Sequence, residues 1–240
     1  MLLRVLLSLF ACASLQVPPP PERGRDPWVF RCVLDQHPRM VVIALSKELW
    51  CAYDAQHCSF YAAWKGRAKL QGAVYDTVHG PQPVIEGTRY ASGFDEHAWE
   101  VYVGDKIVAA DVRWGGYWMH DGRCTLLYEV TLPDGRHFQV RETPEFVQPE
   151  QLFPEEQMQD FVLTRGDTGL GRSFQFVDPP KDVKVCVRMS FANVRGKYVE
   201  VMEREEAVQH EGWIVLLPDR PFVNALLFWK PIEDAPKEPK

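Results

Sequence analysis

The residues that come nearest to a recognition site form the run 114–121, WGGYWMHD. Trp114, Tyr117 and Trp118 place aromatic rings around two glycines, and we expect this run to be a flexible loop. Aromatic rings can stack on the apolar faces of pyranose sugars while neighbouring polar groups bind the hydroxyls. The run therefore predicts a carbohydrate-binding site. The alternative is that the same rings close one end of the hydrophobic core, as large aromatic side chains often do.

Two further groups of polar residues could do chemistry. His79 and Gln82 stand in a proline-bounded loop, where the imidazole could act as an acid–base group or a ligand. A hairpin over 124–142 carries polar residues on its outward face: Glu129, His137, Gln139 and Arg141, with Glu142 at the strand end. Paired acids and a histidine could transfer protons. For both groups the alternative is a solvated polar surface.

The cysteines allow more than one interpretation. Cys51 and Cys58 flank a predicted turn, so they form either a short-loop disulfide or two separate buried thiols. Cys186 has a cationic residue two positions away on each side. If Cys186 is exposed and unpaired, these charges lower its pKa and make it reactive.

Several catalytic and cofactor signatures are absent from the sequence. It contains no C-x-x-C-H haem attachment, no G-x-S-x-G elbow, no H-E-x-x-H motif and no G-x-G-x-x-G after a strand. No cysteine pair has metal-ligand spacing, so we expect neither a cofactor nor a metal. The net charge of -6 argues against nucleic-acid binding, because no basic stripe is present to displace counterions from phosphates.

The first residues predict an exported protein. Arg4 precedes a short apolar stretch that ends in Ala11-Cys12-Ala13, the small-x-small pattern of a signal-peptidase site. We expect a signal peptide over 1–13 and a proline-rich linker over 14–27. The apolar stretch is much shorter than the roughly 20 residues of a transmembrane helix. The expected location is therefore the periplasm or the exterior, with lipid attachment at Cys12 as the alternative.

Short apolar or alternating runs, separated by turn residues, fill the rest of the chain. We expect strands over 28–34, 39–45, 49–54, 61–64, 73–77, 99–103, 107–114, 124–132, 137–142, 173–177, 183–191, 198–202, 213–217 and 222–229. The run 39–45 is apolar on both faces and should be central in its sheet. Pro133-Asp134-Gly135 should make a hairpin turn. The only helix candidate is 152–160, which Pro154 keeps short.

This pattern predicts an all-β fold, either one large, supersandwich-like β-sandwich or two packed β-sandwiches. We expect a β-sandwich region over 28–150 and a second β region over 151–231, continuous with the first. A charged, proline-containing tail over 232–240 should be mobile.

Six segments carry a resemblance to a known family: DPWVFRCVLD (26–35), PRM (38–40), LWCAYD (49–54), WKG (64–66), GAVY (72–75) and HGPQP (79–83). They resemble the N-terminal β-rich domain, of uncertain function, of exported bacterial proteins that also carry c-type cytochrome modules and sugar-dehydrogenase-like propellers. More loosely, 113–142 and 169–176 are similar to large β-sandwiches of carbohydrate-active proteins. The resemblance implies a module that works beside redox or carbohydrate machinery. The family's haem-binding segment is absent here, so electron transfer would need a partner.

These observations predict an exported, non-enzymatic binding module. Its partner would be a carbohydrate or another protein, such as a separate cytochrome. The expected ligand-binding residues are Trp114, Tyr117, Trp118, His79 and Gln82. The alternative is a carbohydrate-active hydrolase or isomerase that uses His79, His120 and Glu129 as acid–base groups. An enzyme of this kind would need at least two of these side chains in one concave pocket.

Overall fold

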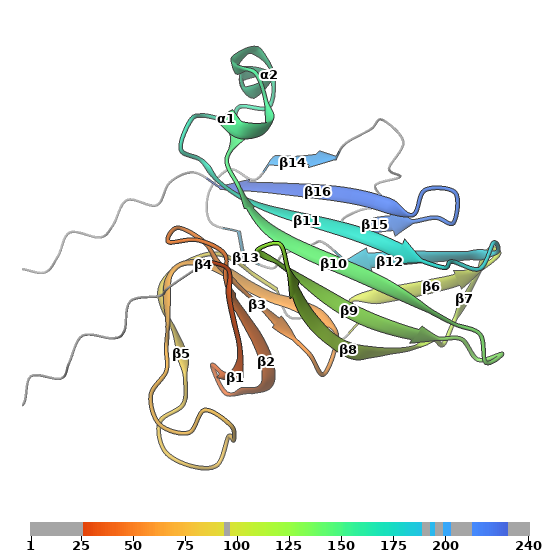
Figure 1. Cartoon of the computed structure of the whole chain (residues 1–240), viewed down its shortest axis with the longest axis horizontal. Coiled ribbons are helices and arrows are strands. Elements are labelled where there is room, and N and C mark those ends of the chain that lie inside the picture. The colour runs from red at the N-terminus through yellow and green to blue at the C-terminus, as the bar shows by residue number, and fades with distance from the viewer. Residues whose placement is uncertain (1–25, 94–96, 189–192, 195–198, 203–212, 230–240) are drawn as a thin grey trace, which may run out of the picture.

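Figure 1 shows the computed structural model, which describes residues 26–93, 97–188, 193–194, 199–202 and 213–229. The strands in this part of the chain form three antiparallel sheets. The expected signal peptide over 1–13, with Cys12, and the expected tail over 232–240 lie outside the described residues, as does all but the end of the linker.

The N-terminal sheet is built mainly from hairpins that follow one another along the chain, in the order β1-β2-β3-β4-β5-β13. Its strands are β1 (Trp28–Leu34), β2 (His37–Ala44), β3 (Trp50–Asp54), β4 (Ser59–Lys69), β5 (Val84–Ser92) and β13 (Asn193–Val194). β2 lies between β1 and β3, and its residues from Met40 to Ala44 are all buried. The expectation that 39–45 is central in its sheet is confirmed, because both faces of this strand are covered.

The long sheet has the order β14-β16-β11-β10-β9-β8. Its strands are β8 (Asp111–His120), β9 (Arg123–Thr131), β10 (His137–Val147), β11 (Thr168–Val177), β14 (Val199–Met202) and β16 (Phe222–Trp229). Buried and accessible residues alternate along β9 and most of β10, as period-two patterning requires for a sheet with one covered face. The expected turn between them is confirmed, since the Leu132 amide donates to the Arg136 carbonyl at 2.8 Å.

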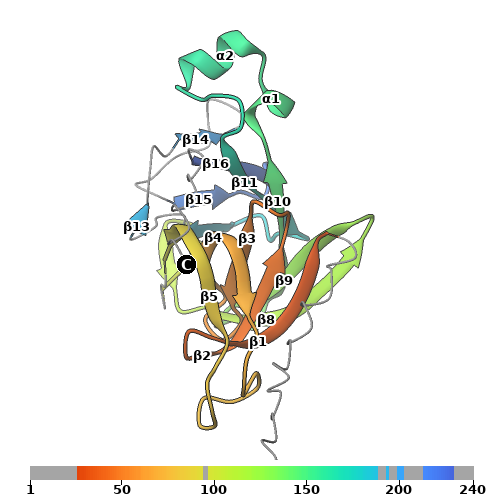
Figure 2. The same ribbon diagram turned by 90° about the vertical axis from the view of Figure 1, so that its left-hand side faces the viewer.

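The small sheet has the order β15-β12-β6-β7, with β6 (Trp99–Val103), β7 (Lys106–Val108), β12 (Val183–Arg188) and β15 (Trp213–Leu216). The main core lies between the long sheet and the other two sheets, and it includes Ile43 of β2, Leu126 of β9 and Val185 of β12. Figure 2 shows the same arrangement from the side. The expected all-β, sandwich-type fold is confirmed.

Strands from both expected β regions occur in every sheet, and in each sheet the two sets meet at one strand pair. β10 pairs with β11, and β6 pairs with β12, although each pair joins a strand before residue 150 to a strand after it. Neither stretch completes its sheets alone, so the two share one main core.

A second core covers the other face of the N-terminal sheet and includes Met40, Trp50 and Trp64. The segment 70–83 lies beside β1, where the Val33 amide donates to the Val74 carbonyl at 2.8 Å. The strand expected over 73–77 is therefore wrong, because this segment is an irregular connection that covers apolar side chains. β5 was not predicted from the sequence, and in it Gly87 lies opposite Gly66 of β4. A side chain at Gly66 would lie 2.2 Å from the Glu86 carbonyl oxygen, so this close approach requires glycine.

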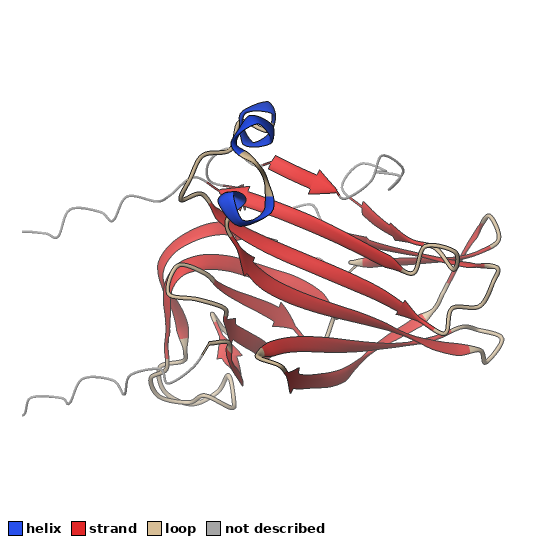
Figure 3. Ribbon diagram, turned by 45° about the horizontal axis from the view of Figure 1, so that its top comes forward, coloured by secondary structure: helices blue, strands red, loops and turns tan. Residues whose placement is uncertain are grey.

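The helical segment expected over 152–160 is two short helices, α1 (Pro149–Leu152) and α2 (Glu155–Asp160). They lie beyond one end of the long sheet (Figure 3), and Met158 of α2 packs with Phe228 of β16. Pro154 stands between them in extended conformation, which confirms that it limits the helix.

Candidate functional site

The aromatic run 114–121, expected as a loop, is mostly part of strand β8. Asp121 and Gly122 both have positive φ angles, of 49° and 75°, and make the two-residue hairpin turn that Asp-Gly favours. His120 therefore lies opposite Arg123, and β8 pairs along its length with β9. The expected loop is wrong because its two glycines accommodate a shift of register between Trp114 and Gly116, a β-bulge, rather than breaking the strand.

The bulge sends the three aromatic side chains in different directions. Trp114 lies opposite Tyr128, and the two rings meet edge to face at 5.8 Å in the main core. Tyr117 lies opposite the buried Leu126, whereas Trp118 lies opposite Thr125 on the outer face. Trp114 thus fits the core alternative, and Trp118 is the aromatic residue that faces outward.

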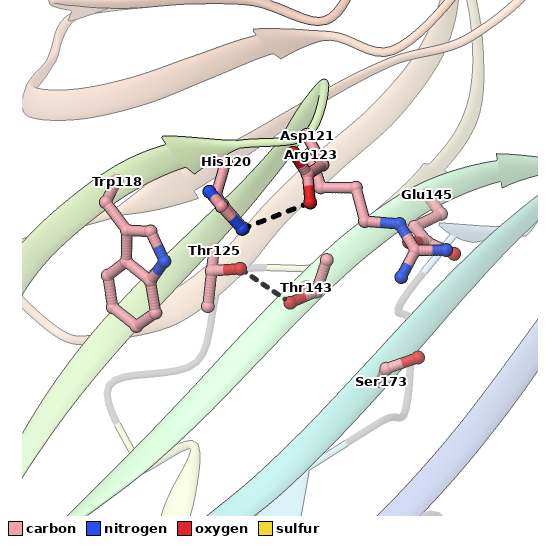
Figure 4. Close-up of a pocket in the computed structure, with 8 residues that line it drawn as sticks. All are labelled: Trp118, His120, Asp121, Arg123, Thr125, Thr143, Glu145 and Ser173. Atoms are coloured by element: carbon pink, nitrogen blue, oxygen red, sulfur yellow. Dashed lines mark hydrogen bonds and ion pairs between the residues drawn. The ribbon is translucent and has the colours of Figure 1, made fainter.

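Trp118 borders a hollow of about 360 Å³ on the outer face of the long sheet. Figure 4 shows its lining, which comes from four neighbouring strands and one turn. The lining residues are Trp118, His120, Asp121, Arg123, Thr125, Thr143, Glu145 and Ser173. Trp118 is the one large apolar ring among them, and every other residue carries a polar, hydrogen-bonding side chain. Its volume falls at the small end of the roughly 300–1,000 Å³ of ligand pockets.

Three internal contacts hold the polar side chains of this hollow in place. Arg123 Nε lies 2.8 Å from Glu145 Oε1, His120 Nε2 lies 3.1 Å from Asp121 Oδ2, and the hydroxyls of Thr125 and Thr143 are 2.9 Å apart. The Arg123 and His120 side chains are largely exposed, so these pairs add little to stability. They do orient a cation, an imidazole and two hydroxyls around one space.

Arg141 of β10 packs against Trp118 of β8 across the intervening strand β9. Its guanidinium carbon lies 5.2 Å from the centre of the Trp118 ring, within cation–π range. Its Nε atom is covered and donates no hydrogen bond among the described residues. The stacking fixes the orientation of the indole ring at the edge of the hollow.

His79 and Gln82 lie elsewhere, in the segment 70–83. Asp76 organises this segment, because its Oδ1 accepts from the amides of Val78 and His79 at 3.0 and 2.9 Å. The His79 ring contacts the same carboxylate, and Gln82 donates to the Asp76 carbonyl. The backbone hydrogen bonds lower the pKa of Asp76. Neither His79 nor Gln82 lines the hollow beside Trp118.

The polar residues of the hairpin also separate. Glu129 lies opposite Arg113 and Gln139 on the outer face, while His120 lies opposite Arg123 at the other end of the hairpin. At about 3.4 Å per residue, Glu129 and His120 are about 20 Å apart along the strands. The three residues of the enzyme alternative, His79, His120 and Glu129, therefore do not converge.

Glu142 was expected on the outward face with Glu129, and this is wrong. It is 1% exposed and points into the main core, where its Oε1 accepts from Tyr53 Oη and Arg172 Nε, each at 2.6 Å. Its Oε2 accepts from Tyr128 Oη at 3.0 Å. Burial and the Glu142 charge raise the pKa of both tyrosines. Burial lowers the pKa of Arg172, but the charge of Glu142, the hydrogen bond to it and the two tyrosines together raise this pKa by more, so the net shift is upward.

The rings of Tyr53, Phe60 and Phe174 surround the Arg172 guanidinium, at 5.1–5.8 Å from its carbon. Both oxygens of Glu142 accept hydrogen bonds, as a buried carboxylate requires. Glu142, Arg172, Tyr53 and Tyr128, which we call the buried cluster, thus join strands of the N-terminal sheet to strands of the long sheet. We assign it a structural role.

The described thiols are all buried and free. The disulfide between Cys51 and Cys58 is therefore not formed, and the alternative of two buried thiols holds. Cys51 faces the main core, while Cys58 approaches the Val112 carbonyl oxygen at 3.8 Å. Cys186 is not exposed, so the condition for a reactive thiol is not met, and burial raises its pKa to about 11 despite the lowering effect of Lys184.

Within the described residues, no group of three or more His, Cys, Asp and Glu side chains is placed to hold a metal ion, and no helix there is long and apolar enough to cross a membrane. No known protein family, curated protein or solved structure matches the chain. The resemblance to domains of cytochrome-containing proteins therefore stays a prediction.

Proposed function

We propose that this chain is an exported, non-enzymatic carbohydrate-binding module whose site is the hollow beside Trp118. The observation that carries the proposal is the outward indole ring at the edge of a space otherwise lined by polar side chains. Sugars present an apolar ring face and a rim of hydroxyls. One fixed aromatic ring with several hydrogen-bonding groups beside it complements both features.

The polar lining supplies both donors and acceptors. Arg123 and His120 can donate, Glu145 and Asp121 can accept, and the threonine hydroxyls can do either. Because the hollow is open and wet, each such hydrogen bond replaces one to water and contributes modestly. The affinity we expect is therefore that of a weak, reversible binder.

The arrangement favours binding over catalysis. Glycoside hydrolysis uses two carboxyl groups that face each other across the scissile bond. In the hollow, Asp121 is paired with His120 and Glu145 with Arg123, and all four side chains are at least partly exposed. Neither carboxyl group is therefore left free to face the other across a bound sugar.

Export, and an association with a separate cytochrome, are parts of this proposal that rest on the sequence alone. The leader-like residues 1–13 support the first, and the family resemblance over 26–90 supports the second.

The test is a panel of soluble mono- and oligosaccharides, with binding measured by calorimetry on the wild type and on Trp118→Ala. We expect the variant to lose at least tenfold in affinity for any sugar that binds the wild type. Arg123→Ala should weaken binding as well, by removing a charged donor to the hydroxyls.

Trp28→Ala is the matched control, because Trp28 is exposed to a similar degree, 43% against 36%, but belongs to the N-terminal sheet. We expect it to bind sugar like the wild type. No binding by the wild type, or a loss in Trp28→Ala with none in Trp118→Ala, would contradict the proposal.

A further inference from the structure

β8 forms one edge of the long sheet, and among the described strands only β9 pairs with it. Figure 1 shows this edge strand at the lower border of the sheet. Its second half carries three exposed apolar residues, Tyr117, Trp118 and Met119, the last of them 45% exposed. A long edge with unpaired backbone groups and apolar side chains is a template for another strand.

The β-bulge gives this edge an unusual side-chain order. In a regular strand Trp114 and Tyr117 would face opposite sides, because their numbers differ by three. The bulge at Gly115 and Gly116 reverses the alternation, so that both lie opposite inward residues of β9, Tyr128 and Leu126. Both rings therefore point to the core side of the sheet.

As a result, core-side and outer-side residues follow in the same order from the middle of β8 toward either end. The pairing of β8 with β9 shows that four residues of β8 lie on the outer side of the sheet: Asp111, Arg113, Trp118 and His120. Four others lie on the core side: Val112, Trp114, Tyr117 and Met119. From Asp111 the order is outer, core, outer, core, two glycines, and then core, outer, core, outer to His120.

We propose that β8 pairs antiparallel with β8 of a second copy of this chain, about a twofold axis that passes between Gly115 and Gly116. Such an axis, perpendicular to the sheet, brings side chains on the same side opposite one another. The two long sheets would then continue into each other across the interface.

The pairs that this register creates are complementary in every case. Asp111 faces His120, Val112 faces Met119, Arg113 faces Trp118 and Trp114 faces Tyr117 of the other copy. These are an acid–imidazole, an apolar, a cation–aromatic and an aromatic pair, all of which stabilise cross-strand contacts. Each occurs twice because the interface is isologous. This self-complementarity argues for a second copy rather than an unrelated strand.

The middle of the strand and its start are compatible with the pairing. A Cβ atom at Gly116 would meet nothing within 4 Å, so Gly116 leaves room on this edge for a backbone, whereas a Cβ atom at Gly115 would lie 2.9 Å from the Leu127 side chain of β9. The Cys58 thiol lies 3.8 Å from the Val112 carbonyl oxygen, and a thiol is a weak donor that a backbone amide can displace.

The inference does not rest on the proposed sugar binding, but it affects the same surface. Trp118 and His120 line the hollow, so the pairing would place Arg113 of the second copy beside each hollow. Two hollows would then share one continuous outer face. The sedimentation test below therefore changes no residue of the hollow, and all tests are made without sugar.

Sedimentation of the full chain tests the association. We expect a concentration-dependent dimer, weakened at least tenfold by Tyr117→Lys and by Met119→Lys, which bring a charge against an apolar partner. Ile107→Lys is the matched control, because Ile107 is exposed on the edge strand β7 of the small sheet. It should dimerise like the wild type. Circular dichroism and thermal unfolding show whether each variant is folded.

Disulfide trapping tests the register with exposed positions that leave the core intact. With Cys12 replaced by serine, the double variant Asp111→Cys/His120→Cys should form a covalent dimer on mild oxidation, because directly opposite Cβ atoms lie about 5 Å apart. Each single variant should stay uncrosslinked, since its two copies of one position would lie about 30 Å apart.

A chain that is monomeric up to about 1 mM overturns the proposal. So does a dimer that Ile107→Lys disrupts and Tyr117→Lys and Met119→Lys do not. Trapping of the single variants as readily as the double one would also overturn it, because the strands would then pair in another register. Loss of sugar binding in Trp118→Ala with the dimer retained would leave the two proposals separate.

Discussion

β10 contributes the glutamate of two glutamate–arginine pairs, one on each face of the long sheet. The nitrogen–oxygen distances of the two pairs are nearly equal. Glu142 meets Arg172 at 2.6 Å on the core side, and Glu145 meets Arg123 at 2.8 Å on the outer side. The core pair is 1–2% exposed, whereas the outer arginine is 67% exposed. Distance alone therefore does not distinguish them, and their surroundings decide what each contributes.

In the core, water is excluded and each partner depends on the other. Removing one would leave a charge without solvent, which costs far more than the pair itself contributes. On the outer face, water can replace either partner, so the same interaction is nearly neutral for stability. The outer pair is thus free to exchange its hydrogen bonds for those of a ligand, and the core pair is not.

The largest effect should follow from breaking the core pair. Arg172→Met leaves Glu142 buried with only two tyrosine donors, and we expect it to lower the free energy of unfolding by about 3–5 kcal/mol. Urea denaturation followed by fluorescence measures it. The double variant Glu142→Leu/Arg172→Met should recover much of the loss, because no charge then remains in the core. A double variant no more stable than the single one would contradict this account.

A smaller effect should follow from removing one hydroxyl of the buried cluster. Tyr128→Phe keeps the ring but takes the donor from Glu142 Oε2. We expect a loss of about 1–3 kcal/mol in the free energy of unfolding, because the carboxylate oxygen stays buried. Tyr102→Phe is the control, since Tyr102 donates to the part-buried Glu100 near the surface. An equal loss in both variants would show that burial is not the cause.

The smallest effect on stability should come from the outer pair. Arg123→Gln is expected to change the free energy of unfolding by less than about 1 kcal/mol, measured in the same way. If the outer face binds sugar, this variant should nevertheless weaken that binding. A loss of stability as large as that of Arg172→Met would show that the two faces do not differ as proposed.

The strands were predictable where one face of the sheet is covered, because apolar and polar residues over 124–132 and 137–142 alternate in step with burial. The same alternation places Glu142 on the side of Phe138 and Val140, yet its charge favoured the surface in the sequence analysis. Its partner Arg172 could not be found in this way. The contact depends on the register of β10 against β11, a pairing between distant segments that no local pattern contains.

The outer site was only partly predictable for a similar reason. Trp118 was selected by its type, but its outward direction depends on a bulge that breaks the period-two pattern. The Asp121-Gly122 pair was a local signal for the hairpin and was not used. Arg123, Glu145 and Ser173 come from three strands, so only their pairing brings them to Trp118.

The order of strands has a consequence for how the chain folds. β1 to β5 pair with their immediate neighbours in sequence, so the contacts that form most of the N-terminal sheet are local. The small sheet instead pairs β6 with β12, and Val103 meets Val183 from a distant part of the chain. Local contacts lose little chain entropy and form quickly, while distant pairings are slow. During synthesis, the N-terminal hairpins can therefore assemble while the small sheet still lacks its central strand, and we expect that late closure to limit the rate of folding.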